Sequence, residues 1–424
     1  MYLLIKSLKV FIVRGFGAAA GFLMNLVVAN TTDINHAGVF FFSLALIQLG
    51  GGLLTLGAPN ALLKVVGADY GVSWKRINQD VTVVLKCVFG LSITLTIVFI
   101  AFPHQISIIL GMPEVESFLP AIALAMLVFS VVQIFSALLQ GKQHAIVAST
   151  VQNVVAQFSF ILILGLAAWF GVTQTSVSLT YLYLCALSLA MVLGLVVWFR
   201  TSGANFETNA KLSPELKASL TALFVAMLMG QCVSWAGQFA TAKYLSASEV
   251  AFFASAQRTA TLAAFVLIAV NLVVAPKFAQ AFAQNKQDEV NKLSLLSSRL
   301  MMLLATPVLL FMIFFPEFLM GLFGEEYKVA APLLQILAVG QFINLITGSV
   351  GYLLNMTGHE KDMRNVVLFS GPLAIVLAFG LTSQFGLMGA AYATAISVAT
   401  QNLLAVWMVK KRLGFNTLNV FRTV

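Results

Sequence analysis

The stretch EVAFFASAQRTATLAAFVLIAVNLVVAPK, residues 249–277, decides the fold, because it is apolar enough to cross a bilayer and yet contains an arginine. At about 1.5 Å per helical residue, Arg258 lies about 12 Å from Val250, inside a hydrocarbon core about 30 Å thick. An arginine near the bilayer centre costs about 2.5 to 3.5 kcal/mol on insertion scales, so it is a functional candidate by default. Ser255 and Thr261 share its helix face. The structural alternative is a hydrogen bond to helix-end carbonyls.

The rest of the chain is equally apolar. Of its 424 residues, 60% are hydrophobic and 9% are charged, with a mean hydropathy of +0.96. A soluble domain has about 25% charged residues. Apolar runs of about 18 to 27 residues suit helices, whereas strands of a membrane β-barrel alternate in polarity over about ten residues. We therefore predict an all-α polytopic membrane protein.

Hydropathy predicts about twelve transmembrane helices, arranged as two six-helix bundles around a central cavity. Residues 1–199 form the N-terminal bundle, residues 200–217 a cytoplasmic linker, and residues 218–424 the C-terminal bundle with a short cytoplasmic tail. The predicted spans are 10–30, 37–57, 81–101, 118–140, 146–169, 177–199, 218–240, 249–275, 299–321, 331–355, 365–383 and 388–409.

The basic residues orient these spans. Nineteen of the 24 Lys and Arg fall on the side shared by both termini, and only Lys243 and Lys328 fall on the other side. Because short cytoplasmic loops are enriched in Lys and Arg, both termini are expected to be cytoplasmic. The net charge of +9 is explained by this distribution, and no nucleic-acid partner is expected.

The two halves carry weak echoes of each other. AGVFFFS (37–43) opens the second span where EVAFFAS (249–255) opens the eighth. The fourth and tenth spans begin at Leu119-Pro120 and Ala331-Pro332, and they end in LLQGK (138–142) and LLNMTG (353–358). Halves with an even number of spans share one orientation, as in transporters built from parallel repeats.

The charges inside the predicted spans are positive. No acidic residue lies deep in a span, whereas Arg14, Lys86 and Arg258 do lie within spans. Buried cations need partners or water, and an anionic ligand would supply them. Arg14 and Lys86 lie about one turn inside cytoplasmic helix ends, where long side chains can snorkel to the surface. Lys86 is the weaker candidate of the two.

Polar or small side chains mark one face of the first, second, seventh and eighth spans, which occupy equivalent places in the two halves. We expect these faces to line a hydrated cavity, although small residues and amides also serve as ordinary packing between membrane helices. Trp235 is suited to stacking on a sugar or to core packing. The predicted lining residues are Arg14, Asn25, Gln48, Gln231, Ser234, Trp235, Gln238, Ser255, Arg258 and Thr261.

Several signatures of enzymes are absent from the sequence. Gly141-Lys142 lacks the preceding glycine and the following Ser or Thr of a P-loop, and the four histidines form no cluster. The three cysteines, Cys87, Cys185 and Cys232, fall in different spans, so we expect buried thiols without a disulfide or a metal. No enzymatic activity, cofactor or metal is predicted.

Three segments carry a resemblance to a known family. They are VVANTTDINHAGVFFFS (27–43), ALLQGKQHA (137–145) and FGEEYKVAAPLLQILAVGQFINLITGSVGYLLNMTGHEK (323–361). Over nearly the whole chain the pattern resembles the flippases of polysaccharide biosynthesis (O-antigen, capsule and exopolysaccharide), in the superfamily of the multidrug and toxin extrusion transporters. The resemblance implies that Arg14 and Arg258 face the diphosphate of a polyprenyl-linked oligosaccharide in a cationic cavity.

The predicted function is therefore a flippase of a polyprenyl-diphosphate-linked glycan, such as a lipopolysaccharide O-antigen unit, in the lipid bilayer of a bacterial inner (cytoplasmic) membrane. Polysaccharide polymerase machinery is a candidate partner. One alternative is a multidrug or cation exporter, which usually depends on acidic residues in the membrane. Another is a peptidoglycan-precursor flippase, which handles the same diphosphate but usually has two more spans. The glycan, the driving force and the oligomeric state are left open.

Overall fold

The computed structural model describes residues 2–68, 74–142, 144–202 and 214–419. These residues form helices and turns, with no strand among them. Ten segments of the described chain are long and apolar enough to cross a membrane: Lys9–Thr31, Ile34–Leu54, Ile77–Ala101, Pro113–Gly141, Ala145–Trp169, Ser176–Thr201, Ala247–Ala283, Gln287–Phe314, Glu325–Met356 and Glu360–Leu413.

Two further features complete the predicted set of spans. Helix α10 (Pro214–Tyr244) has 31 residues and covers the predicted seventh span. Helix α17 (Glu360–Leu413) has 54 residues and is two helices that meet at Gly386, where φ is 57° and ψ is −139°. The prediction of an all-α polytopic membrane protein is confirmed. Part of the predicted linker, residues 203–213, lies outside the described residues.

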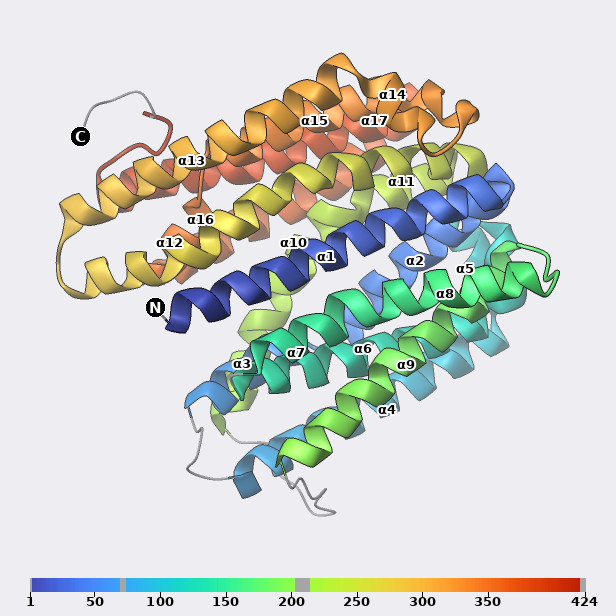
Figure 1. Cartoon of the computed structure of the whole chain (residues 1–424), viewed down its shortest axis with the longest axis horizontal. Coiled ribbons are helices and arrows are strands. Elements are labelled where there is room, and N and C mark those ends of the chain that lie inside the picture. The colour runs from blue at the N-terminus through green and yellow to red at the C-terminus, as the bar shows by residue number, and fades with distance from the viewer. Residues whose placement is uncertain (1, 69–73, 143, 203–213, 420–424) are drawn as a thin grey trace. The chain divides into compact units, whose positions relative to one another are not determined.

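The chain divides into two compact units. The first unit contains Met1–Leu228 and Ser246–Ala251, and the second contains Met229–Leu245 and Phe252–Val424. The elements of the first unit (blue to green in Figure 1) are α1 (Tyr2–Thr31), α2 (Ile34–Leu54), α3 (Ala58–Ala68), α4 (Trp74–Ala101), α5 (Pro103–Leu110), η1 (Pro113–Phe118), α6 (Leu119–Gly141), α7 (Ala145–Thr150), η2 (Val151–Val155), α8 (Ala156–Trp169), α9 (Ser176–Ser202) and the start of α10.

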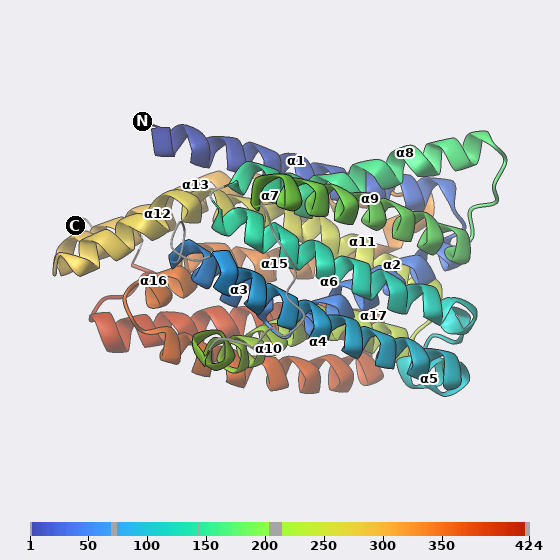
Figure 2. The ribbon, with the colours of Figure 1, turned by 90° about the horizontal axis from the view of Figure 1, so that it is seen from below.

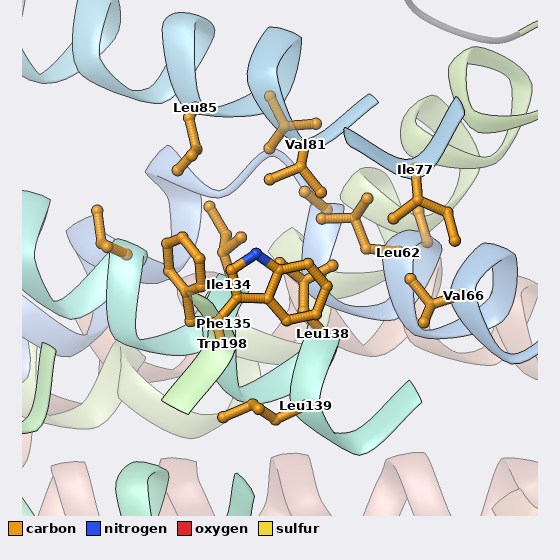
Figure 3. Packing of buried hydrophobic residues seen from close by; sticks show 14 of the residues in the cluster. Leu62, Val66, Ile77, Val81, Leu85, Ile134, Phe135, Leu138, Leu139 and Trp198 are labelled. Carbon is orange, nitrogen blue, oxygen red and sulfur yellow. The ribbon is translucent and has the colours of Figure 1, made fainter. Parts of the chain in front are cut away.

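Helix α6 is the centre of the first unit, because it contacts α2, α3, α4 and α9 (Figure 2). Its C-terminal half packs into a hydrophobic cluster with α3, α4 and α9 (Figure 3). In this cluster the rings of Phe135 and Trp198 meet edge to face, with centroids 6.3 Å apart. Leu62 and Val81 close the cluster from α3 and α4. Such interdigitated packing holds the helices together where lipid supplies no hydrophobic drive.

The second unit is built around α15. Its elements are the end of α10, most of α11 (Ala247–Thr261), η3 (Leu262–Ala264), α12 (Phe265–Ala283), α13 (Gln287–Phe314), α14 (Pro316–Gly321), η4 (Glu325–Ala330), α15 (Ala331–Ile346), α16 (Val350–Met356) and α17. Helix α15 contacts α13 and α17, and α16 packs on α12 and α17. The predicted tenth span, 331–355, is therefore two helices that are separated at residues 347–349.

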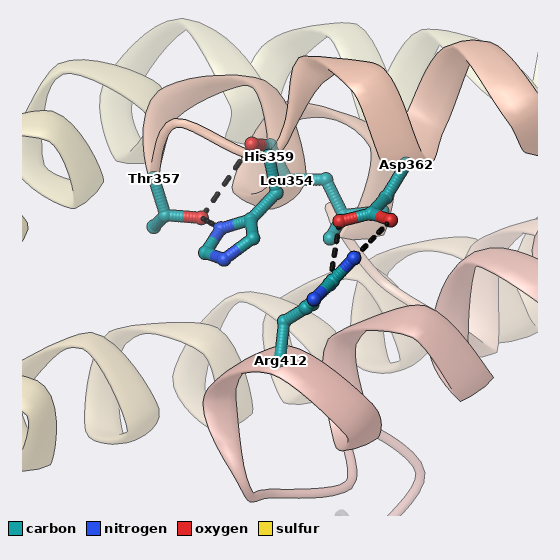
Figure 4. A network of polar contacts seen from close by, with 5 residues as sticks. All are labelled: Leu354, Thr357, His359, Asp362 and Arg412. Atoms are coloured by element: carbon teal, nitrogen blue, oxygen red, sulfur yellow. Dashed lines mark hydrogen bonds and ion pairs between the residues drawn. The ribbon is translucent and has the colours of Figure 1, made fainter.

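One end of the second unit is tied by a polar network (Figure 4). The Arg412 guanidinium donates to both carboxylate oxygens of Asp362, from Nε at 2.7 Å and from Nη2 at 2.9 Å. Thr357 Oγ1 lies 3.2 Å from His359 Nδ1 in the turn before α17. The bidentate pair joins the first and last turns of α17, so the two halves of this long element are held together at that end.

The predicted burial of the cysteines was wrong for two of the three. Cys87 and Cys185 are exposed, Cys232 is half-buried, and all three are free thiols. The outward face of a membrane helix is as apolar as its inward face, so hydropathy could not separate the two.

Candidate functional site

The sharpest cluster in the second unit surrounds Arg258 of α11. Its guanidinium carbon lies 5.9 Å from the centroid of the Trp235 ring on α10. This distance suits a cation–π interaction, which gains strength away from water. Both side chains are half-buried, so the Arg258 guanidinium remains partly accessible to a ligand. The arginine is thus held in a defined position by an aromatic neighbour.

A second contact joins the same two helices beside this pair. Gln257 Nε2 donates to the backbone carbonyl of Ser234 at 2.9 Å. Ser234 and Thr261 are exposed, and their hydroxyls donate to carbonyls of their own helices, at Gly230 (3.2 Å) and Gln257 (2.7 Å). The Gln257 hydrogen bond therefore links α10 and α11 beside Arg258.

Three other predicted lining residues of the second unit differ in exposure. Ser255 and Gln238 are buried, whereas Gln231 is half-buried. The Ser255 hydroxyl has no hydrogen-bond partner within the described chain. Ser255 precedes Arg258 by three residues and therefore lies on the same side of α11. The role of these three residues as cavity lining stays a prediction.

In the first unit, Arg14 lies on α1 next to a widened helical turn. Arg14 Nε donates to Ser149 Oγ at 3.4 Å, a long contact from α1 to α7. Residues Val151–Val155 then form a π-helical turn, a feature often found at functional sites. A Cβ at Gly17 would lie 2.6 Å from the carbonyl oxygen of Asn153 in this turn. Because residue 17 is a glycine, α1 packs closely against the π-helical turn. This close packing positions Arg14 relative to the neighbouring helices.

The remaining predicted residues of the first unit are dispersed. Asn25 is buried, and its Nδ2 donates to the Gly21 carbonyl at 2.6 Å. Gln48 on α2 is half-buried, and Lys86 on α4 is exposed. The structure therefore brings together Arg258, Trp235 and Ser234, and places Arg14 and Asn25 on one helix. That both sets face one cavity stays a prediction.

Sequence reasoning missed several contact residues. Ser149 and Asn153 gave no signal, because their partners lie on a helix more than 130 residues away. Gln257 was readable, since it neighbours Arg258. Lys142 was counted only among the basic residues that orient the spans, yet its side chain is buried. Its Nζ donates to the Thr201 carbonyl at 2.6 Å and lies 5.2 Å from the centroid of the Trp198 ring. Burial lowers the pKa of this lysine.

Residues 222–380 match the family model MatE. The matched residues include Trp235, Arg258 and the separation between α15 and α16.

Named proteins are similar to this chain over most of its length. A Haloferax volcanii protein named "Probable low-salt glycan biosynthesis flippase Agl15" is 26% identical over 416 residues, which are 94% of this chain and 82% of the relative. The structure named "Lipid II flippase MurJ, inward closed conformation" has a TM-score of 0.78 at 14% identity, covering 99% of this chain and 91% of that one.

An inward-facing multidrug resistance MATE family transporter of the MOP superfamily has a TM-score of 0.69 at 14% identity, covering 96% of this chain and 94% of that one. At such identities the two structures show a shared fold and no more. The chain is a multi-pass membrane protein. The named proteins that it resembles are flippases and a transporter.

Proposed function

We propose that this protein is a flippase that moves a polyprenyl-diphosphate-linked oligosaccharide from the cytoplasmic to the outer leaflet by alternating access. The observation that carries the proposal is the Arg258–Trp235 pair, a cation 5.9 Å from the centroid of an aromatic ring within the residues that match MatE. A guanidinium pairs with phosphate oxygens through two parallel hydrogen bonds. The neighbouring ring and the exposed Ser234 offer stacking and hydrogen bonding to a sugar.

The distribution of acidic residues in the second unit favours an anionic substrate over a cationic drug there, whereas Asp80 of the first unit is buried in α4, near the start of the span Ile77–Ala101. In the described part of the second unit, every acidic residue lies in the first turn of a helix: Asp288, Glu289, Glu317, Glu325, Glu326, Glu360 and Asp362. None lies in the interior of a helix there. A site for a lipophilic cation would need a carboxylate or an equivalent acceptor at membrane depth.

The named relatives support the class of substrate. One is named for glycan biosynthesis and another for lipid II, and both are flippases by name. We infer that Arg258 and Arg14 pair with the diphosphate, that polar faces carry the glycan, and that the polyprenyl tail stays in lipid. The cytoplasmic membrane, with both termini cytoplasmic, is the proposed location. We further propose that this membrane is a bacterial inner membrane. In the same proposal, the glycan is of the O-antigen class and the protein contacts a polysaccharide polymerase.

A peptidoglycan-precursor flippase is the second candidate, because MurJ shares the fold over 99% of this chain with a TM-score of 0.78. It handles the same chemical group, so arginine variants do not distinguish the two. Competition between a polyprenyl-diphosphate oligosaccharide and lipid II for the purified protein does distinguish them. We expect the oligosaccharide to displace lipid II.

The test of the proposal is binding to the purified protein, with a polyprenyl-diphosphate sugar compared with a lipophilic cation. Arg258→Ala removes a charge-assisted contact of about 1.5 to 3 kcal/mol, so binding of the sugar lipid is expected to weaken about 10- to 100-fold. Arg258→Lys keeps the charge but loses the bidentate geometry, and an intermediate loss is expected. Arg364→Ala, which removes an exposed arginine on α17, is the control with unchanged binding.

Transport is tested by restoration of surface polysaccharide in a null strain. Arg258→Ala at normal expression is expected to fail, and Arg258→Lys to restore part of the polymer. Full restoration by Arg258→Ala would remove its anchoring role. Preferential binding of the lipophilic cation, indifferent to Arg258, would make drug export the better explanation.

A further inference from the structure

The second half of α17 presents an exposed apolar stripe that ends in positive charge. Ile396, Leu403 and Trp407 are exposed, and they follow one another at intervals of seven and four positions. Residues four and seven apart lie on one side of a helix. Lys411 follows Trp407 by four positions and is also exposed, so it continues the stripe beyond the aromatic ring.

The aromatic ring and the lysine contact each other at the end of this stripe. Lys411 Nζ lies 5.1 Å from the centroid of the Trp407 ring, and 52% of Trp407 is exposed. Tryptophan is enriched where a bilayer meets water, because its ring is apolar and its indole N–H is polar. The cation–π contact keeps the ammonium group beside the ring. The pair therefore marks the level of the bilayer surface at this end of α17.

The length of the stripe fits one leaflet of a bilayer. Trp407 follows Ile396 by 11 positions, which is about 16 Å along a helix. Half of a hydrocarbon core about 30 Å thick is about 15 Å. With Trp407 at the bilayer surface, Ile396 lies close to the midplane, so an acyl chain of one lipid can follow the stripe along its whole length.

Basic side chains gather at the same end of the second unit. The two halves of α17 return to one side, because Arg412 in the last turn pairs with Asp362 in the first (Figure 4). Residues 360–364 and 410–412 contain two acidic residues and five basic ones, the latter being Lys361, Arg364, Lys410, Lys411 and Arg412. This end therefore has an excess of positive charge.

Two of these cations, Lys410 and Lys411, are available to a ligand at the stripe. Arg412 is already occupied, since it donates to both carboxylate oxygens of Asp362 at 2.7 and 2.9 Å. Lys410 and Lys411 are exposed, and neither forms an ion pair with any residue that the structure describes. They follow Trp407 by three and four positions, so both lie on its side of the helix.

The inner side of this helix end is fixed. Val406, Val409 and Leu413 are buried in a hydrophobic cluster that includes residues of α12 and α13. Gln287 Nε2 of α13 donates to the Leu413 carbonyl at 3.2 Å. The stripe is therefore the open side of a helix end that is anchored on its other side, so its charges are held in place for a ligand.

We propose that an anionic phospholipid of the bilayer binds at this stripe. Its phosphate contacts Lys410 and Lys411, its glycerol region lies beside Trp407, and an acyl chain follows Leu403 and Ile396. Charge complementarity selects this occupant, because basic residues at the surface of a bilayer attract anionic headgroups. The apolar stripe selects a lipid over a free phosphate, which would leave the stripe uncovered. The site does not depend on the identity of the transported molecule.

The test is quenching of tryptophan fluorescence in the full-length protein, reconstituted in bilayers of phosphatidylcholine and phosphatidylglycerol. One lipid at a time carries bromine on its acyl chains. The chain has five tryptophans, so the Trp407 signal is the difference between each protein and the same protein with Trp407→Phe. One lysine near an anionic surface contributes about a fivefold preference, or about 1 kcal/mol. Brominated phosphatidylglycerol is therefore expected to be favoured by about 5- to 25-fold at Trp407.

The decisive variant combines Lys410→Gln with Lys411→Gln, which keeps the length and polarity of the side chains. Its preference for phosphatidylglycerol is expected to fall below about twofold. The matched control combines Lys277→Gln with Lys292→Gln, which removes two exposed lysines of α12 and α13. This control is expected to keep the preference of the parent protein.

Equal quenching of Trp407 by the two brominated lipids in the parent protein would overturn the proposal. So would an equal loss of preference in the two double variants, because a diffuse positive surface would then explain the attraction. Lys411→Gln alone is expected to lose about a fivefold part of the preference, and it decides the question if the double variant does not fold.

Discussion

The fourth and tenth spans have similar sequences at their ends but differ in their interiors. In the first unit, α6 runs without interruption from Leu119 to Gly141. In the second, the corresponding span is split into α15 and α16 at Gly348. Both begin with a proline in the first turn and end in a Leu-Leu pair, so the difference lies in the interior of the span.

The spacing of the shared ends explains the difference. Leu138 follows Pro120 by 18 positions, whereas Leu353 follows Pro332 by 21. The tenth span therefore has three more residues between equivalent points, close to one turn of 3.6 residues. An unbroken helix would displace its end by about 4.5 Å. Instead, the helix is interrupted at Gly348, whose left-handed backbone accommodates the three extra residues. Because Gly348 is buried, this interruption places polar backbone groups in the core of the second unit.

The largest effect is expected for Gly348→Ala, which tests whether this glycine holds the break. The new Cβ would overlap Ser298 Oγ, and alanine would be strained at φ of +77°. Strain and overpacking together are expected to lower the free energy of unfolding by about 2 to 4 kcal/mol, measured by thermal or denaturant unfolding in detergent.

Gly351→Ala is the matched control for this variant. A Cβ at Gly351 would lie 3.5 Å from Met363 Cε and 3.8 Å from Met363 Sδ, which are ordinary contacts. Its stability is expected to be unchanged or higher by about 0.5 to 1 kcal/mol, because alanine favours helix. Equal stability of the two variants would show that Gly348 does not determine the break, and the contrast with α6 would lose its explanation.

A smaller effect is expected in the first unit, at the π-helical turn that α1 packs against. This turn is the irregularity compared here with the break at Gly348. Gly17→Ala places a Cβ 2.6 Å from the Asn153 carbonyl oxygen, and overpacking of this kind costs about 1 to 3 kcal/mol. Gly15→Ala has no heavy atom within 4 Å of its Cβ and is expected to be silent. Thermal unfolding of the two variants measures the difference. Equal midpoints would mean that α1 moves away easily and does not set the depth of Arg14.

The smallest change in stability is expected for Lys142→Met, a substitution directly after the end of α6. Loss of the contact to Thr201 is partly offset by relief of desolvation, so a change of about 1 kcal/mol is expected at pH 7. Because burial lowers the pKa of Lys142, the unfolded chain holds this proton more tightly. The free energy of unfolding should therefore rise with pH between the lowered pKa and the ordinary value of 10.5.

Unfolding midpoints between pH 7 and 10 check this slope. Lys328→Met is the control, since Lys328 is 44% exposed and pairs with Glu325 at 2.7 Å before α15. The control is expected to keep the slope and Lys142→Met to reduce it. Parallel pH curves for the parent and Lys142→Met would contradict the assignment to this lysine.

Some of the candidate site was predictable from the sequence, and some was not. Arg258 was found because a charge in a 29-residue apolar run stands out, and Trp235 because its amide neighbours recur at helical spacing. Ser149 was missed because it meets Arg14 only through the packing of α1 on α7. The break at Gly348 was missed because a single glycine inside an apolar span reads as ordinary helix, and the extra residues matter only when the ends are held in place.

The sequence by itself determined the helical class, the number of membrane crossings and the absence of acidic residues from the helix interiors of the described second unit. Each of these depends on the transfer of about 20 consecutive residues from water to lipid, which is a local property. The tertiary structure decided which polar groups meet, including Arg258 on Trp235 and Ser298 at Gly348. These contacts depend on how separate helices pack against each other. Hydropathy does not reveal this packing, because lipid and neighbouring helices are equally apolar.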